Sequence, residues 1–162
     1  VPFSKELWIE RDDYQEVPAK GYFRLFPGNT VRLRHGFVVK CTGYDKATDT
    51  VRCIYYADSK SGTEGADKYK VKGNIHWVSV KHAFTAGVRS YDRLFKSDHP
   101  EGLGDLNPNS KVTSMAQLEP SLQSPEELTF QFERHGYYTL DISATRVFNR
   151  TVSLRDTWQK AG

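Results

Sequence analysis

Long apolar runs, cysteine and methionine are scarce in this sequence of 162 residues. Its apolar stretches are only a handful of residues long, far short of the roughly 20 that a membrane-spanning helix needs, which argues against a helical membrane protein. No basic segment followed by an apolar one opens the chain, so we expect no secretory leader and a cytoplasmic location. The chain begins at Val1 without an initiator methionine, and we therefore expect a fragment of a longer protein.

Only two cysteines are present, Cys41 and Cys53, and no CxxC pair or histidine-rich tract accompanies them. This composition argues against a structural zinc site. A reducing compartment with free thiols is the favoured interpretation. A disulfide is the less favoured alternative, because the two residues can lie opposite each other in a hairpin.

The motifs of common active sites are missing as well. No Gly-x-Ser-x-Gly elbow, phosphate-binding loop, His-Glu-x-x-His or paired-carboxylate motif occurs. A histidine in a strand, such as His76, is more often a structural group than a catalytic base. We therefore expect neither a catalytic residue nor a metal site, and keep a small β-barrel hydrolase using His76 or His135 only as an alternative.

What is present is aromatic and basic. Aromatic residues make up 13% of the chain, enough to build a core and to argue against disorder. The net charge is only +3, but residues 20–96 hold 15 lysines and arginines against 6 acidic residues, a net of +9. A basic middle between acidic flanks is the distribution expected of a protein that touches a polyanion, and a solvated charged face is the competing interpretation.

Hydrophobic alternation predicts strands nearly everywhere. We expect one strand over residues 30–40, a hairpin that closes near Ala47 and puts Cys41 opposite Cys53, and a polar loop over residues 58–67. Further strands are predicted over residues 68–72, 74–80, 88–95, 128–134, 137–141 and 147–154. The pattern of short strands and frequent turns is typical of an all-β barrel or sandwich, and the length allows one barrel or two.

Nucleic-acid binding is the chemistry that these residues favour most. Alternation would put Lys68, Lys70 and Lys72 on one strand face beside Lys60, and Arg32 and Arg34 would form a second basic row that meets phosphates. Tyr55, Tyr56 and Tyr69 could stack on unpaired bases, or pack as cross-strand pairs. Gln131 and Arg134 offer an amide and a guanidinium that can read a base edge, although an ion pair between Glu133 and Arg134 is the simpler interpretation.

Seven blocks of the sequence, in order, resemble the C-terminal anticodon-binding region of the glutaminyl-tRNA synthetase family. They are VPFSKELWIERDD (1–13), VRLRHGFVVK (31–40), VKGNIHWVS (71–79), YDRLF (91–95), EPSL (119–122), FQFERHGY (130–137) and VFNRTVSLRDTW (147–158). The HIGH-like and KMSKS-like signatures of the family's catalytic domain are absent. Glutamyl-tRNA synthetases share the architecture and are one alternative, and a ribosomal-RNA-binding structural barrel protein is another.

The resemblance implies an all-β fold of two tandem six-stranded β-barrels, similar to a ribosomal 5S-RNA-binding protein, with strands exchanged between them. Residues 1–18 plus 100–162 would form the proximal barrel and residues 19–99 the distal one. The implied partner is the anticodon stem-loop of glutamine tRNA. The protein is expected to bind it as a monomer and not to associate with a membrane. The implied cofactors, ATP with Mg²⁺, belong to the missing catalytic domain, which attaches glutamine to tRNA, so none is expected here.

The resemblance also implies roles for single residues. Gln131 and Arg134 match the block that reads the middle anticodon base, and Arg11 matches an arginine near the same pocket. The segment from Lys68 to Lys72 matches a basic segment that meets the third anticodon base. The sequence departs from the family at Tyr69, where an arginine is expected, and at His35, where an asparagine is usual.

Overall fold

The computed structural model describes residues 2–154, which form two units. The N-terminal unit ends at His82 and the C-terminal unit begins at Ala83. Each unit is built from short strands linked by turns, and its helical segments are single 3-10 turns in the described part of the chain. The all-β class predicted from the hydrophobic alternation is therefore confirmed.

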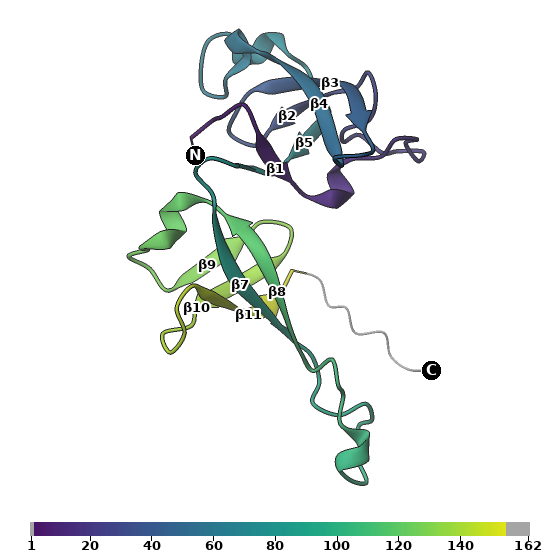
Figure 1. The fold of residues 1–162 in the computed structure, drawn as a ribbon, viewed down its shortest axis with the longest axis vertical. Coiled ribbons are helices and arrows are strands. Elements are labelled where there is room, and N and C mark those ends of the chain that lie inside the picture. Colours follow the sequence, from purple (N-terminus) through teal and green to yellow (C-terminus); the bar gives the residue numbers. More distant parts are fainter. Residues whose placement is uncertain (1, 155–162) are drawn as a thin grey trace. The chain divides into compact units, whose positions relative to one another are not determined.

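The N-terminal unit centres on a four-stranded sheet of order β4-β3-β2-β5, in which β2 and β5 run parallel (Figure 1). β1 pairs separately with β6. Its strands are β1 (Leu7–Ile9), β2 (Thr30–Leu33), β3 (Val38–Asp45), β4 (Thr50–Tyr56), β5 (Gly73–Ile75) and β6 (Trp77–Ser79). Its 3-10 turns are η1 (Arg11–Asp13), η2 (Ala57–Ser59) and η3 (Ala66–Lys68).

The C-terminal unit is a five-stranded sheet of order β8-β7-β11-β10-β9, and only β7 and β11 pair in parallel (Figure 1). Its strands are β7 (Phe84–Tyr91), β8 (Lys111–Leu118), β9 (Thr129–Phe132), β10 (Gly136–Leu140) and β11 (Val147–Ser153). The 3-10 turn η4 (Leu103–Asp105) lies in the β7–β8 connection, and η5 (Pro120–Gln123) follows β8.

Each unit has its own small apolar core, as alternating strands require. On β2, Val31 and Leu33 are almost completely buried while Arg32 between them is half-buried. They pack with Ile75 and Cys41 in the N-terminal core. In the C-terminal unit Phe148 of β11 is fully buried and is surrounded by further aromatic rings.

The division of the chain differs from the predicted one. Residues 7–9 pair with β6, and Tyr14 forms a bridge with Leu25, so the segment before residue 18 pairs within the N-terminal unit. Among residues 2–154, each named strand pairs within its own unit, so the expected strand exchange is not found. The six-stranded barrels stay a prediction, since the hydrogen-bonded strand orders of the described residues are linear.

Local predictions had mixed outcomes. The β3–β4 hairpin is confirmed, and Cys41 lies directly opposite Cys53 in its register. The single strand over residues 30–40 is wrong: the chain reverses between β2 and β3, with His35 at φ 55°. The strand over residues 68–72 is also wrong, because η3 ends at Lys68 and β5 begins only at Gly73.

Candidate nucleic-acid interface

A pocket of about 780 Å³ opens in the N-terminal unit between η1, the segment 21–24 and the segment 72–74. It brings together Arg11 and Lys72, two residues that the sequence predicted separately as RNA ligands. Arg24 is a third cation in the lining, and Asp12 is the acidic member. The lining therefore carries an excess of positive charge, which suits an anionic ligand.

The Arg11 side chain is exposed, but an ion pair restrains it. Its guanidinium forms an ion pair with Asp49 of the β3–β4 turn at 2.9 Å, and the Tyr44 hydroxyl donates to the same carboxylate at 2.5 Å. Hydrogen bonding with Tyr44, followed by the charge of Asp49, raises the pKa of Arg11. The β3–β4 hairpin thus holds the Arg11 side chain at the pocket margin.

Arg24 and Phe23 are functional candidates that the sequence analysis missed. Arg24 forms an ion pair of 3.1 Å with Asp13, whose side chain is completely buried, and it donates to the Asp12 carbonyl. Phe23 is half exposed, and the Lys72 ammonium lies 5.1 Å from its ring centroid, within cation–π range. An aromatic residue next to a basic one was the available signal, but it is too common to be diagnostic.

Arg32 was predicted to contact phosphate, yet its guanidinium contacts protein carbonyls. It donates to the Ser59 carbonyl at 2.7 Å and to the Ala66 carbonyl at 2.9 Å. Ser59 is itself fully buried, where its hydroxyl accepts from the Val38 amide and donates to the Tyr56 carbonyl. Arg32 therefore fixes the loop between β4 and β5.

Arg34 and His35 lie in the reversal between β2 and β3. The Arg34 amide donates to the Ile75 carbonyl, and its own carbonyl accepts from the Trp77 indole. His35 is exposed, with a positive φ of 55°. Histidine is among the non-glycine residues enriched in this backbone region, which suits His35 to the position.

The remaining basic candidates of the N-terminal unit are solvent-exposed: Lys60, Lys68, Lys70 and Lys72. Residues 68–72 do not form a strand, so Lys68, Lys70 and Lys72 are not aligned on one strand face as the alternation predicted. Tyr69, between Lys68 and Lys70, packs against Tyr56 with ring centroids 5.0 Å apart and ring planes tilted by 37°, and it donates to Asp58 at 2.6 Å. The hydrogen bond to Asp58 is the main cause that raises the pKa of Tyr69.

Gln131 and Arg134 lie at the β9–β10 turn of the C-terminal unit. Gln131 is exposed on β9 and pairs in register with Tyr137, while its neighbours Phe130 and Phe132 pack against the core. Arg134 is exposed in the turn at φ 72°. The alternation predicted for this strand is confirmed, and it directs the amide of Gln131 away from the core.

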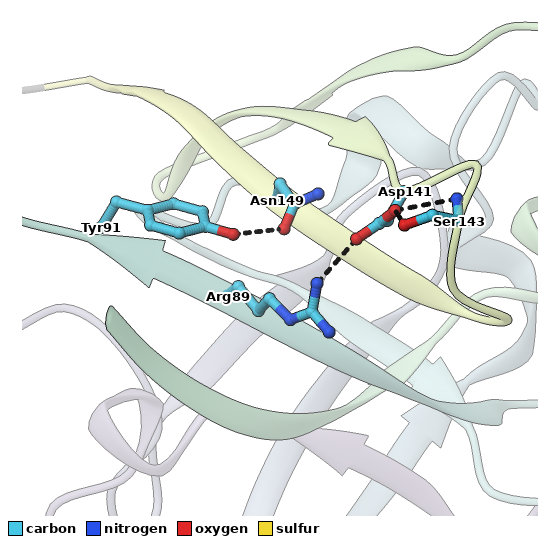
Figure 2. Close-up of polar contacts among 5 residues, drawn as sticks. All are labelled: Arg89, Tyr91, Asp141, Ser143 and Asn149. Carbon is cyan, nitrogen blue, oxygen red and sulfur yellow. Dashed lines mark hydrogen bonds and ion pairs between the residues drawn. The ribbon is translucent and has the colours of Figure 1, made fainter. Parts of the chain in front are cut away.

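A polar network supports the opposite end of β10 in the C-terminal unit, as Figure 2 shows. Arg89 of β7 donates to Asp141 at 2.6 Å, and both the amide and the hydroxyl of Ser143 donate to the other carboxylate oxygen. The Tyr91 hydroxyl donates to Asn149 of β11 at 2.8 Å. Hydrogen bonds from Ser143 and Asn149, and then the Arg89 charge, lower the pKa of Asp141 to about 2.

Residues 2–154 contain no group of three or more histidine, cysteine or acidic side chains arranged to hold a metal ion. The same residues contain no helix that is long and apolar enough to cross a membrane.

Comparison with known proteins gives two family matches. Residues 1–57 and residues 74–141 match two families that share the description tRNA synthetases class I (E and Q), anti-codon binding domain. Together these ranges include Arg11, Arg32 and Arg34 from the N-terminal unit and Gln131 and Arg134 from the C-terminal unit.

Curated relatives agree with these matches. The chain is 54% identical over 173 residues to a glutamine–tRNA ligase of Bordetella pertussis and 55% identical over 174 residues to one of Cupriavidus metallidurans. These alignments cover 99% and 98% of this chain, which spans 30% of the length of each relative. The chain, with its all-β fold, belongs to the anti-codon binding domains of class I tRNA synthetases (E and Q).

Proposed function

We propose that this chain binds the anticodon stem-loop of a glutamine tRNA and recognises it for a glutamine–tRNA ligase. The observation that carries the proposal is the exposed pair Gln131 and Arg134 at the β9–β10 turn. Both side chains can form paired hydrogen bonds with a base edge. The similarity to glutamine–tRNA ligases along nearly the whole chain supports the same partner.

The two units have different tasks in this proposal. The exposed lysines of the N-terminal unit contact backbone phosphates and carry no sequence information. Lys68 and Lys70 lie beside Tyr69, so a base at the third anticodon position can meet both charge and an aromatic face. Arg11 lies at the margin of the pocket in the N-terminal unit and contributes a further cation to RNA binding.

Recognition then depends on the free-energy cost of leaving polar groups without a partner in the complex with RNA. A correct base satisfies the donors and acceptors of Gln131 and Arg134, whereas a wrong base leaves some of them desolvated without a partner. Each such mismatch costs on the order of 1–3 kcal/mol. This cost discriminates among bases even though phosphate contacts supply much of the affinity.

In this proposal the chain binds RNA as a monomer in the cytoplasm and without a cofactor. In a complete ligase, ATP and Mg²⁺ serve a catalytic domain, and we assign no step of that chemistry to residues 2–154.

The test is a titration of the 162-residue chain into fluorescent anticodon stem-loops at several salt concentrations. One stem-loop carries a glutamine anticodon, a second differs only in the middle base, a third carries a glutamate anticodon, and a fourth is unrelated. The glutamate stem-loop shares the middle base and differs in the third, so it separates the two alternatives within the family. Light scattering on the same samples gives the number of protein chains per complex.

We expect the glutamine stem-loop to bind tightest, and the middle-base change to weaken binding by about tenfold or more, the effect of one lost base contact. Equal binding of all four stem-loops at low salt would contradict base reading by this chain. Preference for the glutamate stem-loop would reassign it to a glutamate tRNA.

A further inference from the structure

The two cysteines of the chain face each other across the β3–β4 hairpin. Cys41 of β3 and Cys53 of β4 are direct register partners, and both are free thiols. Hydrogen bonding between the two thiols is one of the causes that shift the pKa values of Cys41 and Cys53. The proposed RNA binding assigns no role to these two cysteines.

The backbone geometry of the pair suits a covalent link. The Cys41 amide donates to the Asn29 carbonyl, and the Cys41 carbonyl accepts from the Gly28 amide. Both polar groups of Cys41 therefore point away from β4, which makes Cys41 and Cys53 a non-hydrogen-bonded pair. In such pairs the Cα atoms lie about 4.5 Å apart and the side chains approach closely. Disulfides accept Cα separations of about 4.4–6.8 Å.

The two thiols differ in access. Cys41 is completely buried within the N-terminal core, whereas Cys53 is exposed. A small reagent can therefore approach Cys53 more readily than Cys41. The buried thiol can react only with a partner that is already beside it, and Cys53 is such a partner.

We propose that Cys41 and Cys53 are a thiol–disulfide exchange site that takes a low-molecular-weight disulfide such as oxidised glutathione. The Cys53 thiolate attacks one glutathione sulfur, breaks its disulfide bond and releases one reduced glutathione. The Cys41 sulfur then gives up its proton, attacks Cys53 and displaces the second reduced glutathione. Overall two protein thiols are oxidised to one cross-strand disulfide, and one small disulfide is reduced to two thiols.

The site reacts slowly at neutral pH. Burial raises the pKa of Cys41, and desolvation and the neighbouring Cys41 raise the pKa of Cys53 to about 12, even though Cys53 is exposed. Since the thiolate is the attacking species, little of either thiol is active at any moment. The incubation with the reagent must therefore be long.

The test is incubation of the full chain with oxidised glutathione, followed by intact mass measurement under denaturing, non-reducing conditions. Cys53→Ser and Cys41→Ser are treated in parallel. A urea-denatured wild-type sample shows that the reagent is active. Because Cys41→Ser puts a hydroxyl into the core, Cys53→Ser is the variant on which the test depends if the other does not fold.

We expect the folded wild-type chain to lose two hydrogen atoms and retain no glutathione, while Cys53→Ser stays unmodified. Folded Cys41→Ser should retain one glutathione on Cys53. The oxidised wild type should also unfold at a higher temperature than the reduced one, and dithiothreitol should reverse this shift. A wild-type chain that retains glutathione on Cys53, forms disulfide-linked dimers, or stays reduced while the denatured sample reacts would overturn the proposal.

Discussion

The N-terminal and C-terminal units of this chain present different chemistry to a ligand. Residues 1–82 hold 14 lysines and arginines against 10 acidic residues, whereas residues 83–162 hold 9 against 10. In the N-terminal unit the candidates are cations around a pocket, several of them held by carboxylates or carbonyls. In the C-terminal unit Gln131 and Arg134 lie at one turn. The difference teaches that the cationic candidates and the candidates for hydrogen bonding to a base edge lie in separate units of the chain.

The largest effect that tests this division is expected for Gly136→Ala, at the start of β10. Gly136 has a φ of 144°, and an added Cβ would lie 2.3 Å from the Val152 carbonyl oxygen. We expect a loss of about 3 kcal/mol in the stability of the C-terminal unit, the sum of backbone strain and a steric clash. Peptide-level hydrogen exchange should show faster exchange in β9–β11 and unchanged exchange in β2–β4.

Gly102→Ala is the matched control, because an added Cβ there meets nothing within 4 Å. This variant should exchange like the wild type throughout the described residues. If Gly136→Ala accelerated exchange equally in both units, the units would unfold together and the comparison would fail.

The next largest effect is expected for Gln131→Ala. Loss of its amide should weaken binding of a glutamine anticodon stem-loop by about 1–3 kcal/mol, because a base edge loses its partner. The dependence on salt should stay the same, since no phosphate contact is removed. Titration by fluorescence anisotropy measures both quantities.

Thr129→Ala is the control for Gln131→Ala, because Thr129 is exposed on the same face of β9 two residues away. Its binding should match the wild type. If both alanine variants lost affinity equally, the effect would belong to the strand and not to the Gln131 amide.

Substitution of a lysine in the N-terminal unit should change the salt dependence of binding and leave the base preference unchanged. Lys72→Ala should reduce the salt dependence of binding by about one phosphate contact and weaken all stem-loops to a similar extent. The measurement is the slope of affinity against salt concentration, compared with the exposed Lys81→Ala. A change in base preference without a change in slope would show that Lys72 reads bases.

A smaller effect on the stability of the C-terminal unit is expected when the pH is lowered. The folded pKa of Asp141 is about 2 and its ordinary value is 3.8, so its contribution to stability is complete above the ordinary value and is lost as pH falls toward about 2. Thermal unfolding of the C-terminal unit should therefore shift downward over this range. Asp141→Asn should be less stable at neutral pH and should lack this part of the pH dependence; an unchanged dependence would contradict the role of the network in Figure 2.

The smallest effect is expected for Asp49→Ala in the N-terminal unit. The ion pair of Asp49 with Arg11 is largely exposed, and such pairs contribute little to stability. The unfolding midpoint should not change measurably, whereas RNA affinity at low salt should rise slightly because one repelling charge is gone. A clear drop in the unfolding midpoint would show that the hairpin depends on this pair.

Much of this architecture could be predicted from the sequence, and the errors have identifiable causes. Alternation correctly gave the β3–β4 hairpin, the Cys41–Cys53 register and the outward direction of Gln131. It failed over residues 30–40, because Arg34, His35 and Gly36 form a reversal whose positive φ the alternation does not reveal. It failed again at residues 68–72, where the lysines alternate but the chain forms no strand between η3 and β5.

The candidate pocket could be predicted only in part. Arg11 and Lys72 are recognisable as cations from the sequence, but their proximity depends on the packing of segments some 60 residues apart. The buried Asp13 beside Arg24 gives no signal, since aspartate is normally exposed. The same limit applies to Arg32, which looks like a surface cation and is used inside the fold.

The position of Arg32 has a consequence for the entropy of binding. By donating to carbonyls at both ends of the segment from Ser59 to Ala66, it restricts a polar loop that would otherwise sample many conformations. A loop that is ordered before its ligand arrives loses less conformational freedom on binding, so more of each contact remains as affinity. In the proposed complex, Arg32 would therefore favour RNA binding by ordering the loop that carries Lys60.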